Sequence, residues 1–316
     1  MAAPGIDGNT RARLRIGTRG SPLALAQAHE TRDRLIAAHP DLAASGAIEI
    51  RVIKTTGDKV QDRPLSEIGG KGLFTKEIED ALLDGAIDLA VHSMKDVPTQ
   101  LPDGLEIGCL LEREDARDAL IASSGSSIAT LPQGAVVGSA SLRRAAQIKA
   151  QRPDLAIVPL RGNVETRIAK VARGDAVATL LALAGLKRLG KRAAATALLS
   201  IEEILPAVAQ GAIGIETRRG DARVAALLAP LNHAPTASRV AAERACLEVL
   251  EGSCRTPIAA YAEIAGSNLH LRALLALPDG SVVHRHEGNA PVGEAGRLGA
   301  EIGRRLKDQA GPDFPR

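Results

Sequence analysis

Residues 88–98 read Asp-Leu-Ala-Val-His-Ser-Met-Lys-Asp-Val-Pro, an apolar run that ends directly against a lysine and a carboxylate. Short apolar runs of this kind are typical of strands in parallel sheets, and we expect a strand over Ile87–His92. Open α/β sheets bind ligands beyond the carboxyl ends of their strands. Lys95 and Asp96 are therefore predicted to lie at a functional site, although an Asp before Val-Pro is also ordinary turn chemistry.

The same alternation of apolar runs and amphipathic stretches continues on both sides of this strand and predicts βα units around mostly parallel sheets. The expected strands are Leu14–Thr18, Ala135–Gly138, Ala156–Leu160 and Ala178–Leu183. The expected helices are Ser21 to about His39, Thr75–Asp84 with Gly85 as its C-cap, Leu142–Gln151 and Val164–Arg173. Because the pattern restarts after the charged loop 112–118, we predict two α/β units of similar build.

The stretch from about Pro235 onward has a different organisation. It predicts a helix over Ala237–Leu250 and strands over Pro257–Ile264 and Leu269–Leu277, which together suit a small α+β domain. A chain of 316 residues exceeds the size at which one hydrophobic core stops growing. Two α/β units and a small third domain fit this length.

Composition and charge exclude several classes of function. The net charge is only +3, with no long basic block, so the chain lacks the positive field of a nonspecific nucleic-acid binder. Phe74, Tyr261 and Phe314 are its only aromatic residues, too few for base stacking. No apolar run approaches the ~20 residues that span a bilayer, and residues 1–10 show no signal or transit pattern. We expect a cytoplasmic protein without a nucleic-acid or membrane partner.

The cysteine pattern points to reduced thiols. The three cysteines form no Cys-x-x-Cys pair and leave one unpaired in any pairing, which argues against a disulfide framework and a zinc site, and we predict no metal. Cys246 occupies an apolar helical position and is predicted to be a core residue. Cys254 lies in Glu-Gly-Ser-Cys-Arg-Thr-Pro, where Arg255 favours the thiolate, so it is a candidate covalent attachment point or an incidental loop cysteine.

Cations follow several predicted strand ends, next to hydroxyl residues that can cap the following helix. A helix N-terminus offers unpaired N–H groups and a positive dipole end, so a hydroxyl cap with an adjacent arginine forms an anion site. Each of these arginines taken alone is equally an ordinary surface residue, but their repetition favours a polycarboxylate ligand. The residues concerned are Arg19 with Ser21, Lys95, Arg143 and Arg144 with Ser141, and Arg161.

Several collinear segments resemble the porphobilinogen deaminase family, also called the hydroxymethylbilane synthase family. They run in the family's order from about residue 14 to 264, and such a set is highly specific. The segments are Thr18-Arg-Gly-Ser-Pro-Leu-Ala-Leu25, Gly69-Gly-Lys-Gly-Leu-Phe74, Ala90-Val-His-Ser-Met-Lys-Asp-Val-Pro98, Ser141-Leu-Arg-Arg144, Leu160-Arg-Gly-Asn163, Ala184-Gly-Leu-Lys-Arg-Leu189 and the Cys254 loop with Pro257-Ile258.

The resemblance implies an α/β fold with two doubly wound domains of periplasmic-binding-protein type II topology, a cleft between them and a small C-terminal α+β domain. The expected domain bounds are 1–111 with 212–229 for the first, 117–205 for the second and 234–316 for the third. A monomer is expected.

The resemblance also implies the site. Asp96 would be the catalytic acid, and Cys254 would hold a dipyrromethane cofactor through a thioether. The remaining family positions that bind cofactor carboxylates are Lys95, Ser141, Arg143, Arg144, Arg167 and Arg188. Those expected to contact substrate are Arg19, Ser21, Arg161, and Lys71 and Phe74 of the loop that covers the cleft.

The implied reaction is the stepwise head-to-tail condensation of four porphobilinogen molecules, with loss of ammonia, into linear hydroxymethylbilane of tetrapyrrole biosynthesis. The alternative is a non-enzymatic two-domain protein that binds small anions, since paired α/β domains with cationic strand ends also serve that purpose. Such a protein has no need of Cys254. The chain departs from the family's usual pattern at Ala116, Ser139-Ala140, Ala209 and Ser253. None of these departures removes a charged residue or the Cys254 thiol.

Overall fold

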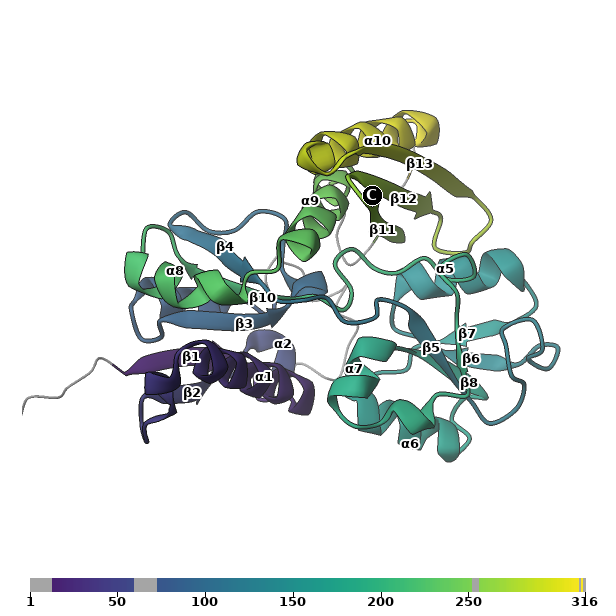
Figure 1. Cartoon of the computed structure of the whole chain (residues 1–316). Helices are drawn as coiled ribbons and strands as arrows, with labels where there is room; N and C mark the ends of the chain where they lie inside the picture. Colours follow the sequence, from purple (N-terminus) through teal and green to yellow (C-terminus); the bar gives the residue numbers. More distant parts are fainter. Residues whose placement is uncertain (1–12, 60–72, 252–255, 313, 315–316) are drawn as a thin grey trace, which may run out of the picture.

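The computed structural model describes residues 13–59, 73–251, 256–312 and 314. These residues form three lobes, each built around its own sheet (Figure 1). The first and second lobes lie side by side, at the left and right of Figure 1, and the third lies above them.

The first lobe holds a five-stranded sheet in the order β2-β1-β3-β10-β4. β1 pairs in parallel with β2 and β3, whereas β10 is antiparallel to both of its neighbours. The strands are β1 (Leu14–Thr18), β2 (Ile48–Val52), β3 (Leu89–Ser93), β4 (Leu105–Leu110) and β10 (Ile213–Arg218). The helices are α1 (Pro22–Ala38), α2 (Thr56–Lys59), α4 (Lys76–Leu83) and α8 (Ala222–Leu228), and short 3-10 turns lie at Pro40–Ala43, Met94–Asp96 (η2) and Ala229–Leu231.

The second lobe repeats this plan in the order β7-β6-β8-β5-β9, with β5 as the antiparallel strand. Its strands are β5 (Asp118–Ala122), β6 (Val136–Gly138), β7 (Ala156–Val158), β8 (Ala178–Ala182) and β9 (Ala197–Leu198). Its helices are α5 (Leu142–Gln151), α6 (Val164–Ala172) and α7 (Leu183–Arg188), with a 3-10 turn at Arg192–Ala194.

The antiparallel strand of each large sheet is the point where the chain passes between the lobes. Residues 111–117 lead out of β4 into β5, and residues 199–212 lead from β9 back into β10. If the strands of each lobe are counted along the chain without the antiparallel strand, both sheets have the order second, first, third, antiparallel strand, fourth. This shared order confirms the expected class, two doubly wound α/β domains of the type II topology, although neither β5 nor β10 was predicted from the sequence.

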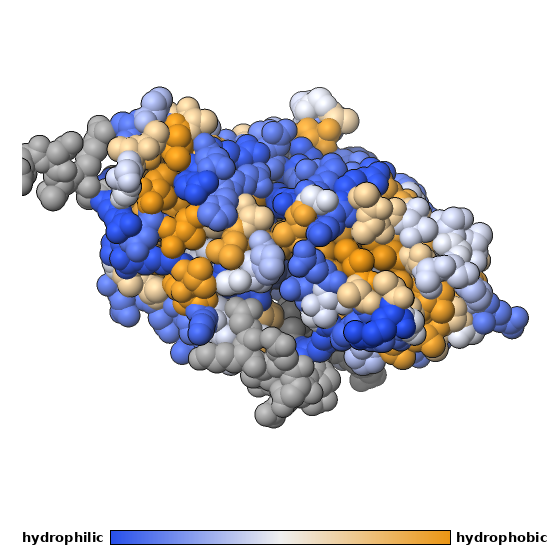
Figure 2. All heavy atoms as spheres, turned by 90° about the horizontal axis from the view of Figure 1, so that it is seen from below, coloured by the Kyte–Doolittle hydropathy of each residue, from blue (hydrophilic) through white to orange (hydrophobic). Residues whose placement is uncertain are grey.

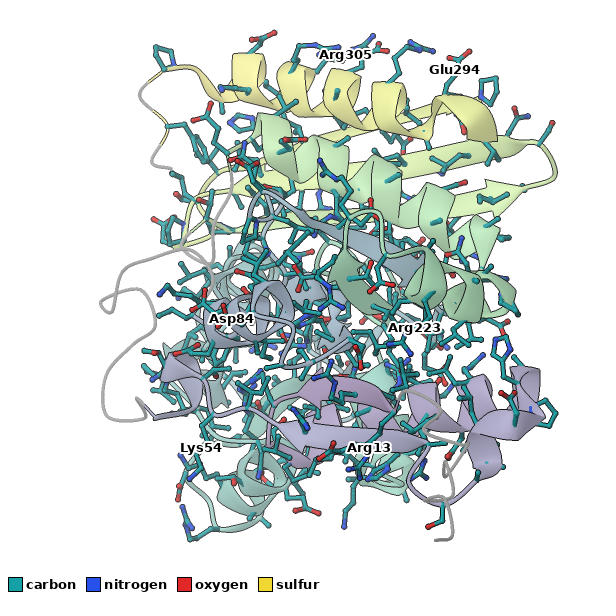
Figure 3. All side chains as sticks on the ribbon, turned by 90° about the vertical axis from the view of Figure 1, so that its left-hand side faces the viewer. Arg13, Lys54, Asp84, Arg223, Glu294 and Arg305 are labelled. Carbon is teal, nitrogen blue, oxygen red and sulfur yellow. The ribbon has the colours of Figure 1, made fainter. Side chains whose placement is uncertain are left out.

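The third lobe packs two helices on one antiparallel sheet. The sheet β11-β12-β13 consists of β11 (Ile258–Ala265), β12 (Asn268–Ala276) and β13 (Val283–Pro291), covered by α9 (Ala234–Val249) and α10 (Ala295–Ala310), with a 3-10 turn at Val292–Glu294. The expected small α+β domain is confirmed, with β13 and α10 as additions. Seen from the side in Figure 3, Arg305 lies on the outer side of α10, where Glu301 accepts a hydrogen bond from it at 2.6 Å.

The expected helices α1 and α5 begin directly after serine caps, whereas α9 begins at Ala234, three residues before the expected Ala237. The side chains of Ser21 and Ser141 accept hydrogen bonds from Ala24 N at 3.3 Å and Arg144 N at 3.4 Å. Gly85 follows α4 with a left-handed φ of 66°, as expected of a C-cap. These local signals are confirmed because each depends only on residues within one turn of chain.

Apolar side chains on both faces of the first sheet explain why β3 is a continuous apolar run. Leu89 and Val91 pack with α1 and α8 on one face, and Ala90 packs with Ile78 and Leu82 of α4 on the other. Strands buried on both faces lose the polar alternation of a surface strand. On the face shown in Figure 2, hydrophobic patches on both large lobes are interrupted by hydrophilic residues.

A further core joins the first lobe to the third. It contains Met94 and Val97 from the end of β3 together with Val240 and Cys246 of α9. The predicted core position of Cys246 is therefore confirmed, and burial raises the pKa of its thiol to about 12. The loop that carries Lys95 and Asp96 is anchored on the third lobe.

Candidate functional site

The site begins at the carboxyl end of β3, where Lys95 and Asp96 lie on the 3-10 turn η2. Both side chains are exposed, whereas the flanking Met94 and Val97 are buried. The backbone N–H of Met94 donates to Ala212 O at 3.1 Å, at the end of the segment that returns to β10. Buried neighbours and a backbone hydrogen bond thus present the lysine and the carboxylate in a fixed place.

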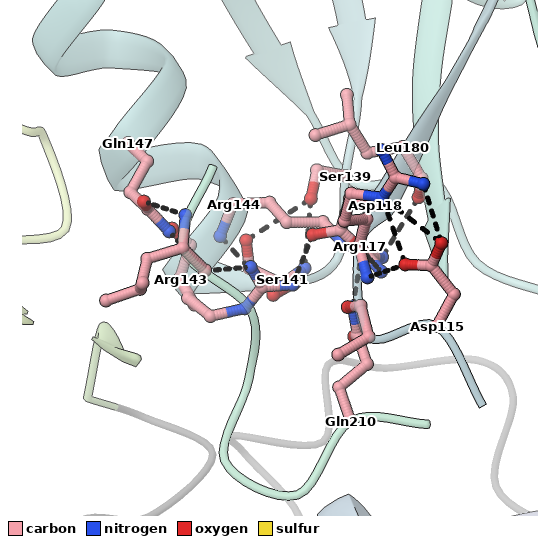
Figure 4. A network of polar contacts seen from close by, with 12 residues as sticks. Asp115, Arg117, Asp118, Ser139, Ser141, Arg143, Arg144, Gln147, Leu180 and Gln210 are labelled. Atoms are coloured by element: carbon pink, nitrogen blue, oxygen red, sulfur yellow. Dashed lines mark hydrogen bonds and ion pairs between the residues drawn. The ribbon is translucent and has the colours of Figure 1, made fainter. Parts of the chain in front are cut away.

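On the second lobe, Arg143 and Arg144 lie in the first turn of α5 and are almost fully buried. Arg143 Nη2 donates to Asp118 Oδ2 at 2.8 Å, and Arg144 Nη2 donates to Asp118 Oδ1 at 2.7 Å (Figure 4). The other terminal nitrogens donate to the carbonyls of Leu205 at 2.6 Å and Leu180 at 2.9 Å. One buried carboxylate therefore orients both guanidinium groups.

The charges of this triad depend on one another. Burial alone would raise the pKa of Asp118, but Arg143 and Arg144 hold it below its usual range. Burial lowers the pKa of Arg143, and Asp118 opposes that shift. The Nε atoms of both arginines are buried and have no hydrogen-bond partner among the described residues. Each arginine therefore keeps one donor for another acceptor.

Charged groups from the two lobes lie close enough to perturb one another's pKa. Although the Lys95 side chain reaches solvent, desolvation by the surrounding protein lowers its pKa to about 8; Asp96 opposes this shift, and Arg144 and Arg143 add to it. Desolvation lowers the pKa of Arg167 to about 10, with Arg144 and Arg161 adding to the shift and Asp96 opposing it. The expected cluster of cations around one exposed carboxylate is present.

Three helices of the two large lobes have starts that are capped by a hydroxyl or amide side chain. Ser21 caps α1, Ser141 caps α5, and Asn163 caps α6 through a hydrogen bond from Thr166 N at 2.8 Å. Ser139 supports the second of these, because its Oγ accepts from Ser141 N at 3.1 Å. The remaining N–H groups of each first turn suit anionic groups.

Two of the expected ligand-binding arginines have contacts with other parts of the protein. Arg188 donates to Glu30 Oε2 and to Gly211 O, both at 3.1 Å, and so bridges α7, α1 and the segment before β10. The guanidinium of Arg19 lies 4.1 Å from the centre of the Phe74 ring, a cation–π geometry. Their binding roles stay predictions, and the expected residues Lys71 and Cys254 lie outside the described residues.

Four functional candidates were not found from the sequence: Asp118, Gln210, Glu243 and Arg244. Gln210 Nε2 donates to Asp118 Oδ1 at 2.9 Å and to Ala116 O at 2.7 Å. Asp118 is one of four acidic residues in the charged loop 112–118, and nothing in the local pattern distinguishes it from the others. Only the fold shows which carboxylate faces the arginines.

The described residues contain no group of three or more His, Cys, Asp or Glu side chains with the spacing of a metal site. Among the same residues, no helix is long and apolar enough to cross a membrane.

A two-lobed α/β fold whose facing sheet ends gather cations around one exposed carboxylate defines a class of protein built to hold a polyanionic ligand. Comparison with known proteins identifies the family. Residues 14–226 match the family model "Porphobilinogen deaminase, dipyromethane cofactor binding domain", and residues 237–308 match "Porphobilinogen deaminase, C-terminal domain". The chain belongs to the porphobilinogen deaminase family.

Named relatives agree over nearly the whole chain. The chloroplastic porphobilinogen deaminase of Oryza sativa subsp. japonica is 59% identical over 304 residues, covering 95% of this chain and 85% of the relative. The porphobilinogen deaminase of Paracoccus denitrificans is 58% identical over 301 residues, covering 95% of this chain and 96% of the relative. The chain thus contains the family's dipyrromethane-binding domain, and Cys254 falls within the C-terminal match.

Proposed function

We propose that this chain is a transferase that condenses four porphobilinogen molecules head to tail and releases linear hydroxymethylbilane. In each condensation the C–N bond to the aminomethyl nitrogen breaks and ammonia leaves. A C–C bond then forms between that methylene carbon and the free α-carbon of the terminal pyrrole of the growing chain, and this α-carbon loses its proton. After four additions, hydrolysis of the bond that holds the chain releases hydroxymethylbilane, and water supplies its hydroxyl group. The observation that carries the proposal is the coupling of Asp96 and Lys95 of the first lobe to the arginines of the second, in a chain that matches this family along its length.

Asp96 acts as the catalytic group. As an exposed carboxylate among cations, it can accept a hydrogen bond from the leaving amine. It can then accept a hydrogen bond from the pyrrole N–H and so stabilise the positive charge that develops on that ring. The anchored turn η2 holds this carboxylate in place during successive additions. No second exposed carboxylate appears among the residues that couple to Lys95 and Arg167.

The cations hold carboxylates of the substrate and of the growing chain. Lys95 and Arg167 both couple electrostatically to Asp96 and to Arg144. Arg143 and Arg144 share Asp118 as their counter-charge, so positive charge predominates around the exposed carboxylate. A site lined mainly by positive charge attracts anions, so this distribution favours a ligand that carries carboxylates. Ser21, Ser141 and Arg19 lie at or beside capped helix starts and add donors for the same groups.

A dipyrromethane cofactor fits the residues present. The unpartnered Nε atoms of Arg143 and Arg144 are buried donors, and guanidinium groups bind carboxylates well. When bound, the dipyrromethane supplies the free pyrrole position to which the first substrate unit is joined. We propose attachment through a thioether at Cys254, further carboxylate contacts from Arg188, and a covering role for Lys71 and Phe74. The expected domain bounds, the monomeric state and the cytoplasmic location stay predictions.

Incubation with porphobilinogen tests the function. The enzyme releases ammonia and a product that cyclises to uroporphyrin on standing, whereas an anion-binding protein of the alternative class returns the substrate unchanged. Asp96→Asn should keep its cofactor and lose most turnover. Near-normal turnover of that variant would remove Asp96 from the catalytic role.

Intact mass spectrometry tests the cofactor and its attachment. We expect purified protein to carry the extra mass of a dipyrrole, Cys254→Ser to lack it, and Cys109→Ala to retain it as the matched control. Recovery of the extra mass on Cys254→Ser would refute the assignment. Cys109 is a suitable control because it is buried among residues of the first lobe.

A further inference from the structure

Arg244 of α9 makes an unusual set of contacts for a half-buried arginine. Its Nη1 donates to Val97 O at 3.0 Å, and its Nη2 donates to Pro98 O at 2.6 Å and to Thr99 O at 3.3 Å. These are the three consecutive carbonyls that directly follow Asp96 in the chain. The planar guanidinium fork of an arginine suits such a set, because its N–H donors diverge in one plane.

The segment held in this way has little other regular structure. Residues 97–100 belong to no helix or strand, and Pro98 has no N–H to donate. Upstream of Asp96, the chain is fixed by β3 and by the hydrogen bond from Met94 N to Ala212 O. Downstream, Arg244 supplies the donors that the carbonyls need. The turn that presents Asp96 is thus held at both ends.

Packing alone does not explain an arginine at this place. Burial lowers the pKa of the Arg244 guanidinium, and the nearby Glu248 opposes that shift. A buried charge costs stability, and an apolar side chain of similar volume would often pack such a junction at least as well. The contribution that only an arginine makes here is the geometry of three hydrogen bonds.

We propose that Arg244 is a positioning residue for the condensation reaction: it fixes the Asp96 carboxylate by holding the backbone of residues 97–99. This inference rests on the proposed function. It also gives α9 a specific role, because the helix that leads toward Cys254 in the sequence is the one that holds the catalytic loop. A loose loop would displace Asp96 from the reacting groups, and a displacement of about 1 Å can lower a rate by about 100-fold.

The test compares Arg244→Gln and Arg244→Lys with Arg239→Gln in protein whose cofactor loading has been checked by intact mass. Arg239 lies on the same helix and is not buried, and within the described part of the chain it donates only to Pro235 O, at 3.2 Å, in the first turn of that helix. We expect Arg244→Gln to lower kcat by about 10- to 100-fold with KM changed less than about twofold. Arg244→Lys should recover part of this loss, because an ammonium can donate to one or two of the carbonyls, and Arg239→Gln should match the wild type.

A double-mutant cycle with Asp96→Asn separates positioning from general stabilisation. If Arg244 acts through Asp96, Arg244→Gln should lower the residual rate of the Asp96→Asn protein little further, because residues that act as a unit are not additive. If Arg244→Gln lowers the rate by the same factor in the wild-type and the Asp96→Asn backgrounds, the proposal is overturned. A kcat equal to that of the wild type in cofactor-loaded Arg244→Gln would also overturn it. If Arg244→Gln does not fold, Arg244→Lys decides alone. The proposal is then overturned if Arg244→Lys has the kcat of the wild type and shows no greater rise in activity than the wild type on heating or at low denaturant.

The outcomes for the two proposals differ. A wild-type protein that releases no ammonia from porphobilinogen would end the proposed function and this inference together. A wild-type protein that turns over normally, with an inactive Asp96→Asn variant and a fully active Arg244→Gln variant, would end this inference alone.

Discussion

At the scale of single residues, the site depends on two aspartates with opposite environments. Asp96 is exposed at a strand end, whereas Asp118 is buried between Arg143 and Arg144. The exposed carboxylate is available to a ligand, and the buried one fixes the cations that face it. The two aspartates therefore differ in what they can contact, because Asp96 can meet a ligand and Asp118 meets only protein groups in its surroundings.

Asp118→Asn should lower the free energy of unfolding at pH 7 by about 3–5 kcal/mol, because it leaves two buried guanidinium groups without their counter-charge. The pKa of Asp118 lies below its usual range in the folded protein. Its contribution is therefore present above the unfolded-state pKa of about 3.9 and is lost as pH falls toward the folded-state value. Urea unfolding at pH 7 and at several values below pH 4 measures this, and the variant should show the flatter pH dependence.

Asp115→Asn is the control for this prediction. Asp115 pairs with Arg117 at 2.7 Å near the surface, so its loss should cost less than about 1 kcal/mol. Equal losses from the two variants, or parallel stability curves for Asp118→Asn and wild type in acid, would contradict the role given to Asp118.

At the scale of elements, β10 packs against the turn η2, which carries Lys95 and Asp96. Gly214 of β10 lies opposite His92 of β3, and a Cβ at position 214 would overlap the Met94 sulfur and lie 2.8 Å from Met94 Cγ. Met94 is buried and belongs to η2, which carries Lys95 and Asp96. The lack of a side chain at 214 thus lets two sequence-distant segments pack closely.

Gly214→Ala should lower the free energy of unfolding by about 1–3 kcal/mol and also lower kcat, because Met94 must move and carry η2 with it. Thermal unfolding and steady-state turnover measure the two effects. Gly296→Ala is the matched control, since nothing lies within 4 Å of a Cβ there and an alanine in α10 should stabilise the helix by up to about 1 kcal/mol. A Gly214→Ala protein with unchanged stability and rate would show that η2 does not depend on this contact.

At the scale of the whole molecule, one carboxylate joins all three lobes. Glu243 of α9 accepts two hydrogen bonds from Arg113, at 2.6 and 3.1 Å, in the segment that leaves the first lobe. It also accepts from Ala209 N at 2.6 Å, in the segment that leaves the second lobe, and from Ala262 N of β11 at 2.8 Å. Ala209 itself has a left-handed φ of 57°, a conformation that costs a non-glycine residue energy.

Glu243→Gln should lower the free energy of unfolding by about 3–5 kcal/mol and make unfolding less cooperative, because the buried Arg113 loses its counter-charge and one backbone N–H loses its acceptor. Calorimetry measures both effects. Glu301→Gln, which removes exposed ion pairs on α10, should change stability by less than about 1 kcal/mol. A single sharp transition at the wild-type temperature for Glu243→Gln would exclude this junction as the link between the lobes.

Sequence by itself determined the features that depend on local chemistry. The helix starts at Ser21 and Ser141, the apolar strand before Lys95 and Asp96, and the family motifs were all readable because each lies within a short stretch of chain. The tertiary structure alone decided which strand enters which sheet, which carboxylate pairs with Arg143 and Arg144, and which arginine holds the chain after Asp96. The physical reason is that these contacts join residues 25 to 147 positions apart, and no local propensity specifies which of many similar charged side chains will meet there.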